Sequence, residues 1–172
     1  PLISNFALMS NPILILNHTQ VKHKITRLAW QIYEQHFAET ELIICGVYNG
    51  GFVLSQRLFN KLKEISHFNL THAGVYVNRT GGMNEVSIEP DLDLKGKTVI
   101  LCDDVLHSGK TLALATTLFI KADVKKLQCL VLIHRNHPNF PVHPALVGLS
   151  LATTLQEHIE VKFGQEDRVY LS

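Results

Sequence analysis

The stretch Val99–Thr111, which reads VILCDDVLHSGKT, carries the residues best suited to chemistry in this sequence. Four apolar residues lead to two adjacent carboxylates, Asp103 and Asp104, and a short loop with Ser108 and Gly109 follows before the next helix. Free backbone N–H groups at a helix N-terminus, together with Ser and Thr hydroxyls, bind phosphate. Two carboxylates beside such a loop would repel a bare phosphate, so their partners should be hydroxyls or hydrated Mg²⁺. The pattern therefore predicts a ligand with a phosphate at one end and a diol at the other, such as a ribose 5-phosphate.

A P-loop, a receiver domain and a phosphatase each fit this stretch less well. Gly109-Lys110-Thr111 is similar to the end of a P-loop, but the glycine that a P-loop needs at its start would fall on Asp104. A receiver domain or a phosphatase would use the acidic pair, yet neither accounts for the Ser-Gly-Lys-Thr that follows. A plain strand–turn–helix corner with two solvated aspartates stays open as the non-functional alternative.

The elements that must position this motif alternate along the chain. Apolar periodicity and capping residues predict helices at about 17–37, 52–65 and 111–121, and strands at 41–47, 67–77, 97–104 and 126–134. This rhythm indicates an α/β fold, a mostly parallel twisted sheet flanked by helices. In such folds ligands bind beyond the carboxyl ends of the strands, so we expect chemistry in the loops after Val47, Val77, Asp104 and His134.

Two segments break the rhythm. Residues 79–90, with two adjacent glycines and a final proline, predict a loop. After Arg135 the proline-rich stretch predicts an irregular cover over one end of the sheet, and residues 157–172 predict two short strands around Gly164.

Composition sets further bounds on the protein. The 172 residues fit one domain, and a charged fraction of only 18% excludes wholesale disorder. No apolar run approaches the roughly 18–20 residues of a membrane span, and no basic segment precedes the apolar start as in a secretory signal. The cysteines Cys45, Cys102 and Cys129 lie in or beside apolar runs, so we expect buried thiols and a cytoplasmic location. The net charge of +1 does not distinguish nucleic-acid binding from other functions.

Several of these segments together resemble a known family. Val99–Thr111 resembles the 5-phosphoribosyl-1-pyrophosphate (PRPP) signature of type I phosphoribosyltransferases, and its DDVL form is most similar to the pyrimidine-operon attenuator and uracil phosphoribosyltransferase group. Ile44–Val47 followed by Asn49–Gly51 resembles the pyrophosphate loop of that family. Leu130–Leu151 is similar to its strand and base-covering hood. The resemblance implies a single domain over residues 1–172, with a hood of roughly 135–160 plus the N-terminal segment.

The resemblance also implies an activity: transfer of the 5-phosphoribosyl group of PRPP to a nucleobase, uracil first, with release of pyrophosphate. Mg²⁺ would be the cofactor, a nucleobase or nucleoside monophosphate the other ligand, and a homodimer or homotetramer the assembly. The implied catalytic residues are Asp103, Asp104 and, from a mobile flap, Arg79. The implied binding residues are His107, Ser108, Gly109, Lys110 and Thr111 for the 5-phosphate; Tyr48, Asn49, Gly50, Gly51 and Arg135 for pyrophosphate; Val105, Val147, Gly148 and Leu149 for the base; and Asp103 and Asp104 for Mg²⁺ through water.

Alternatives to uracil transfer stay open. Asn49-Gly50-Gly51 is more similar to the hypoxanthine-guanine branch, although that branch has an acid where His107 stands. A nucleotide-sensing attenuator could bind RNA through the basic helix face of Lys22, His23, Lys24 and Arg27. The regulator group usually has an arginine at the place of Gly50, so a protein that binds PRPP but transfers slowly is a third alternative. His134, His137 and His143 are a weak metal candidate, since no carboxylate or cysteine completes the set.

Overall fold

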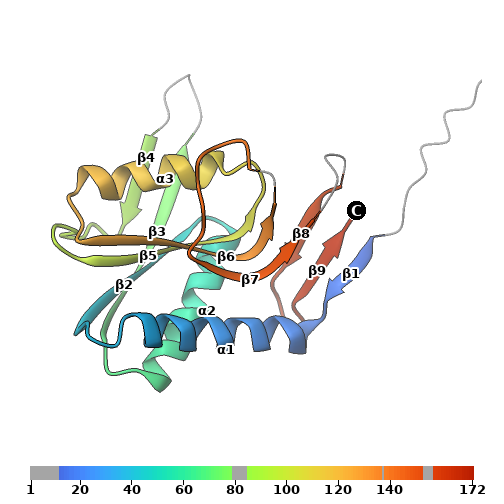
Figure 1. The fold of residues 1–172 in the computed structure, drawn as a ribbon, viewed down its shortest axis with the longest axis horizontal. Coiled ribbons are helices and arrows are strands. Elements are labelled where there is room, and N and C mark those ends of the chain that lie inside the picture. The colour runs from blue at the N-terminus through green and yellow to red at the C-terminus, as the bar shows by residue number, and fades with distance from the viewer. Residues whose placement is uncertain (1–11, 79–84, 137, 153–156) are drawn as a thin grey trace, which may run out of the picture.

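The computed structural model describes residues 12–78, 85–136, 138–152 and 157–172 (Figure 1). Its helices are α1 (His18–Gln35), α2 (Gly50–Ile65) and α3 (Lys110–Lys121). Its strands are β1 (Ile13–Leu16), β2 (Glu41–Val47), β3 (Asn69–Asn78), β4 (Glu85–Glu89), β5 (Thr98–Leu106), β6 (Lys126–Arg135), β7 (Leu146–Leu151), β8 (Ile159–Lys162) and β9 (Arg168–Leu171). The predicted α/β alternation is confirmed.

A six-stranded sheet forms the body of the protein, in the order β4-β3-β2-β5-β6-β7. All its neighbours pair in parallel except β4, which is antiparallel to β3. β5 therefore lies in the middle of the sheet, between β2 and β6. Strands at such positions are buried on both faces, which explains why the interior strands have continuous apolar runs.

Helices cover both faces of this sheet (Figure 1). α1 and α2 pack on one face, where Leu28 and Leu58 contribute to the larger hydrophobic core. α3 packs on the opposite face through Leu112 and Phe119. α1 begins with a capping box, because the Asn17 side chain accepts from the Gln20 N–H and the Gln20 side chain accepts from the Asn17 N–H, each at 2.9 Å. No described helix is long and apolar enough to cross a membrane.

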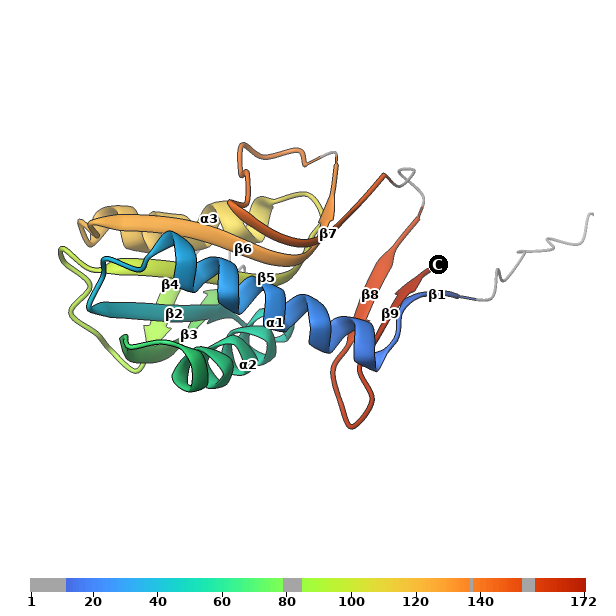
Figure 2. The ribbon, with the colours of Figure 1, turned by 60° about the horizontal axis from the view of Figure 1, so that its bottom comes forward.

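A second, three-stranded antiparallel sheet, in the order β1-β9-β8, lies beyond the carboxyl ends of the parallel strands (Figure 2). It joins the two ends of the chain, since Ile13 pairs with Leu171. Ile159 and Val169 from this sheet enter the same hydrophobic core as α1 and α2. We call this sheet the hood sheet.

Three sequence expectations need correction. The sequence predicts a loop at residues 85–89, but they form strand β4, since their alternating side chains let Val86 and Ile88 pack on the core. Part of the expected irregular cover, Leu146–Leu151, is strand β7 of the main sheet, because it pairs in register with β6. α2 begins at Gly50 instead of Phe52, so the adjacent glycines belong to its first turn.

The three cysteines are buried and free, as the sequence predicts. Burial raises the pKa of the Cys45 thiol to about 12 and that of the Cys129 thiol to about 11. Thiols with such pKa values remain protonated and behave as small apolar side chains.

Candidate functional site

The acidic pair lies near the end of β5, at the middle of the sheet. Both carboxylates are partly exposed, and their position is fixed by short local hydrogen bonds. The Asp104 N–H donates to Asp103 Oδ1 at 3.0 Å, and the Val105 N–H donates to Asp104 Oδ1 at 2.8 Å. On the β2 side the last pairing joins Gly46 to Cys102. The pair therefore stands where β2 has ended and its loop turns over β5.

That loop, which we call the glycine loop (Val47–Gly51), closes directly on the acidic pair. A Cβ at Gly50 would collide with the Asp104 carboxylate. A Cβ at Gly51 would lie 2.6 Å from the Cys102 carbonyl oxygen. Only glycine allows this approach, so the structure gives a reason for two glycines that the sequence alone presents as a turn signal.

The phosphate loop (His107–Thr111) turns from β5 into α3. Gly109 is its turning point, with a φ of 81° in the left-handed region, and α3 begins at the next residue. A small cavity of about 70 Å³ lies in the loop. Asp103, Val105, Ser108 and Thr111 are among its lining residues. The cavity is the size of one small group, which suits a single phosphoryl group held by hydroxyls and the helix N-terminus.

The segment after β6 braces the phosphate loop from outside. The N–H groups of Asn139 and Phe140 donate to the Ser108 carbonyl oxygen at 2.9 and 3.1 Å. Within the loop, the Lys110 N–H donates to Ser108 Oγ at 3.3 Å. Lys110 itself is exposed and does not line the small cavity, in contrast to its predicted neighbours Ser108 and Thr111.

His107 lines the small cavity and also contacts residues at the hood sheet. Arg135 Nη1 lies 3.3 Å from His107 Nδ1, and the imidazoles of His107 and His158 stack at 4.9 Å with an interplanar angle of 2°. Burial, followed by the charges of His158 and Arg135, lowers the pKa of His107, against smaller raising effects of Asp104 and of a hydrogen bond with the Ile159 backbone. His107 is therefore neutral near pH 7.

Arg135 lies with the phosphate loop. It ends β6, and β5 separates β6 from the glycine loop at the end of β2. Its guanidinium contacts His107, and its role in pyrophosphate binding stays a prediction.

The Tyr48 side chain points away from the acidic pair. Its ring stacks between Phe52, at 4.4 Å, and Tyr76, at 4.1 Å. It lies over Gly74 of β3, on the opposite side of β2 from the aspartates. Tyr48 therefore anchors the glycine loop and leaves its backbone, with Asn49, to meet a ligand.

The expected base-binding residues are divided between two places. Val105 lines the phosphate-loop cavity, whereas Val147, Gly148 and Leu149 lie on β7, two strands away from β5. The Arg27 guanidinium donates to the carbonyl oxygens of Val147 and Gly148 at 2.9 and 2.7 Å. The structure thus gives those two carbonyls a partner from α1, which no sequence pattern indicated. Arg79 lies outside the described residues.

The acidic pair fits a magnesium ion held through water. Carboxylate oxygens are the ligands that Mg²⁺ prefers, and Mg²⁺ usually keeps several waters and substrate oxygens. Among the described residues there is no group of three or more His, Cys, Asp or Glu that could hold a metal by itself. His134 and His143 stack edge to face at 6.2 Å, and His137 lies outside the described residues.

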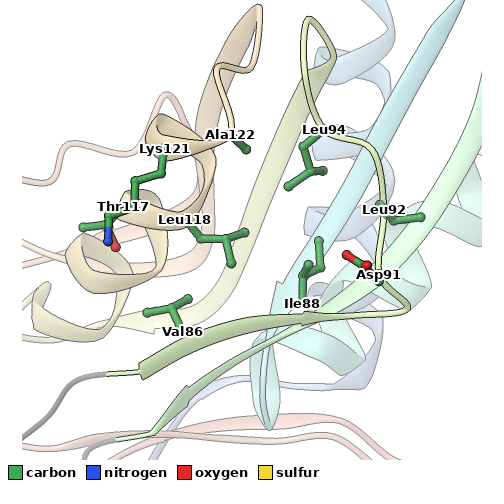
Figure 3. A pocket seen from close by; sticks show the side chains of 9 residues that line it. All are labelled: Val86, Ile88, Asp91, Leu92, Leu94, Thr117, Leu118, Lys121 and Ala122. Carbon is green, nitrogen blue, oxygen red and sulfur yellow. The ribbon is translucent and has the colours of Figure 1, made fainter.

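The structure also has a larger hollow, of about 420 Å³, between β4 and α3 (Figure 3). Val86, Ile88 and Leu118 are among its lining residues, together with the polar side chains of Asp91, Thr117 and Lys121. None of the predicted site residues lines it. The small cavity beside the acidic pair is lined by predicted site residues that include Asp103, Ser108 and Thr111, so it is the candidate site.

Comparison with known proteins points to one family. The model of the phosphoribosyl transferase domain matches residues 14–164. Proteins named "Bifunctional protein PyrR" are similar over most of their length. That of Microcystis aeruginosa is 28% identical over 163 residues, which are 90% of this chain and 92% of the relative. That of Brevibacillus brevis is 29% identical over 92% of this chain and 94% of the relative.

Solved structures share the fold at low identity. A hypoxanthine-guanine phosphoribosyltransferase of Bacillus anthracis superposes with a TM-score of 0.69 at 22% identity, covering 81% of this chain and 82% of that one. The hypoxanthine phosphoribosyltransferase of Trypanosoma cruzi superposes with a TM-score of 0.72 at 14% identity, covering 80% and 81%. At such identities the likeness concerns the fold.

Proposed function

The chain belongs to the phosphoribosyl transferase domain family, and from this membership we propose that it transfers the 5-phosphoribosyl group of PRPP to uracil with release of pyrophosphate. The observation that carries the proposal is the meeting of three features at the middle of the sheet. The phosphate-loop cavity includes Asp103 in its wall, and the glycine loop closes on Asp104. Such a site matches a sugar phosphate that carries a second anionic group at its other end.

In this proposal the ligand spans the three features. Ser108, Thr111 and the N-terminus of α3 hold the 5-phosphate. Asp103 and Asp104 hold the two ribose hydroxyls, directly or through water, and the backbone of Asn49–Gly51 surrounds the pyrophosphate. Bound Mg²⁺ would neutralise charge on the departing pyrophosphate.

The reaction needs positioning more than covalent catalysis. A ring nitrogen of the base forms a bond to C1 of the ribose, the bond from C1 to the pyrophosphate oxygen breaks, and the nitrogen gives its proton to the departing pyrophosphate or to water. Positive charge develops on the ribose ring during this exchange, and the carboxylates of the acidic pair stabilise it. The hood sheet and the segment after β6 would exclude water from the site.

The direct test is conversion of labelled uracil to its monophosphate with PRPP and Mg²⁺, run beside hypoxanthine, guanine, xanthine and adenine. We expect the highest kcat/KM with uracil. Preference for hypoxanthine or guanine would assign the protein to purine salvage instead, and no turnover with any base would refute the transferase proposal.

A pair of threonine variants assigns the activity to the proposed cavity. Thr111 lines it, whereas Thr117 lies on the exposed side of the same helix. Thr111→Val removes a hydroxyl without changing shape, so the KM for PRPP should rise about tenfold from the loss of a charge-assisted hydrogen bond. Thr117→Val should leave the KM unchanged, and an equal KM in both variants would place the phosphate elsewhere.

The name of the relatives indicates two functions without naming the second, and the exposure of Lys22 and His23 on α1 favours RNA binding for it. Filter binding with pyrimidine-leader RNA at several salt concentrations tests it. RNA held by cations loses affinity as salt increases, so saturable binding with a negative salt slope would support this function. Binding that neither saturates nor depends on salt would dismiss it.

A further inference from the structure

His107 joins the phosphate loop to the hood sheet. Its imidazole meets the Arg135 guanidinium at the end of β6, stacks on His158 and hydrogen bonds with the Ile159 backbone. Ile159 begins β8 and His158 comes directly before it, far along the chain from the loop. One side chain of the phosphate loop therefore has three partners outside it, one in the hood sheet and one directly before its strand β8.

The proton arrangement of this contact is determined by its partners. A guanidinium can only donate, so His107 Nδ1 accepts from Arg135 and carries no proton. The proton of the neutral ring is then on Nε2, the nitrogen left for the Ile159 backbone. Neutral imidazole is the form that can accept at one nitrogen and donate at the other.

We propose that His107, supported by Arg135 and His158, is a positioning residue that holds the hood sheet in register with the phosphate loop. The inference rests on the proposed function and deepens it. The phosphate loop fixes one end of PRPP, whereas the hood covers the base, so the contact sets the distance and angle between the two reactants. Misplacement of reactants by about 1 Å costs up to roughly 100-fold in rate.

This role explains why a histidine fits this place. A carboxylate at position 107 would have no proton to donate to the Ile159 backbone. An apolar side chain there would deprive the Arg135 guanidinium of its acceptor. Glutamine, in contrast, has an oxygen that accepts and an amide nitrogen that donates, as neutral histidine has. Glutamine is therefore the substitution that should preserve the contact.

Steady-state kinetics of three variants test the proposal. His107→Ala should lower kcat with uracil about tenfold while the KM for PRPP changes less than about threefold, because the phosphate contacts of Ser108 and Thr111 remain. His107→Gln should restore kcat to within about threefold of the unchanged protein. His158→Ala, which removes the stacked ring, should give an intermediate kcat.

His67→Ala is the matched control. His67 is an exposed imidazole just before β3, at the amino ends of the strands, and its removal should change neither kinetic constant. Unchanged kcat in His107→Ala would overturn the proposal. So would a defect in His107→Gln as large as that in His107→Ala, because the role depends on the donor and acceptor pair.

Hydrogen exchange separates this inference from the proposed function. In His107→Ala, amides of 107–111 and 159–162 should exchange faster together, while those of α2 keep their rate. Coupled loosening in a protein that transfers to no base would uphold the contact and refute only the transferase proposal. Unchanged exchange in both segments would refute the contact, whatever the activity.

Discussion

At the scale of single residues, the close approach of Gly50 to the Asp104 carboxylate defines the site. The glycine loop can reach the acidic pair only because Gly50 has no side chain, and the carboxylate occupies the space that a Cβ would need. Two carboxylates concentrate negative charge at the point where a ribose ring would become positive during transfer. The chemistry of the site therefore depends on a close backbone approach as much as on its acids.

Asp104→Asn should lower kcat/KM for PRPP about 100-fold while the protein remains folded, because the amide oxygen can still accept from the Val105 N–H but the negative charge is lost. Initial rates over a range of PRPP and Mg²⁺ concentrations measure the effect. Asp91→Asn, an exposed acid distant from the cavity, is the control. Kinetics of Asp104→Asn equal to those of the control would contradict the role of the pair.

Gly50→Ala should lower kcat/KM for PRPP by about tenfold or more, since the added methyl group pushes the glycine loop from the Asp104 carboxylate. Gly164→Ala adds the same methyl group at a place with no atom within 4 Å and should leave activity unchanged. Both variants are compared by initial rates and by melting temperature. Normal activity in Gly50→Ala would show that the loop does not approach the pair during catalysis.

At the scale of elements, each helix and strand places one part of the site. β5 carries the acidic pair and the phosphate loop, β2 delivers the glycine loop from one side, and β6 delivers Arg135 from the other. α1 contributes indirectly, because its Arg27 fixes two carbonyls of β7. α1 thus contacts the edge strand that carries the predicted base-binding residues.

Asn17→Ala should lower the free energy of unfolding by about 1 kcal/mol, because the Gln20 N–H loses its side-chain acceptor while the backbone N–H of residue 17 can still donate to Gln20. Urea denaturation followed by circular dichroism measures the change. Asn17→Asp keeps an acceptor for the Gln20 N–H and should stay within a few tenths of a kcal/mol of the unchanged protein. Equal loss in both variants would show that the cap does not stabilise α1.

At the scale of the whole molecule, one ion pair attaches the hood sheet to the main body. Asp167, buried in the turn between β8 and β9, pairs with Arg57 of α2 and accepts from the Gly164 N–H at 3.1 Å. The Arg57 guanidinium also lies over the Phe163 ring at 4.9 Å. Burial alone would raise the pKa of Asp167, but hydrogen bonds from Arg57 and Gly164 outweigh it and lower the pKa.

The lowered pKa makes this stabilisation dependent on pH. A carboxyl group whose pKa is lower in the folded state stabilises the fold above its unfolded pKa of about 3.9, and the effect is lost as the pH falls through the folded pKa. Asp167→Asn should therefore cost about 2 kcal/mol at pH 7, and the difference should shrink below about pH 4. Urea denaturation between pH 3 and pH 7 measures it.

Glu160→Gln is the control for that experiment, since Glu160 forms an exposed pair with Lys162 at 3.3 Å. Exposed pairs contribute little, so this variant should match the unchanged protein throughout. A constant difference between Asp167→Asn and the unchanged protein at all pH values would show that the charge of Asp167 does not provide the stabilisation.

The sequence by itself determined the α/β alternation, the acidic pair and the phosphate loop. These features are local: an apolar run, two acids, a glycine turn and a helix start follow one another within Val99–Thr111, and backbone geometry depends on neighbouring residues. The resemblance to the family followed mainly from the same stretch, together with Ile44–Gly51 and Leu130–Leu151. The sequence did not predict the strands β4 and β7, because edge strands depend on contacts with a partner strand for their formation.

Only the tertiary structure decided the partners of the site. His107 meets His158, and Arg27 meets Gly148, across large separations in the chain. Tyr48 turns toward Tyr76, and Arg135 turns toward the phosphate loop, because the order of the strands places β3 and β5 beside them. Such contacts depend on which strands become neighbours, and that order arises from packing of the whole chain, which no local spacing of residues encodes.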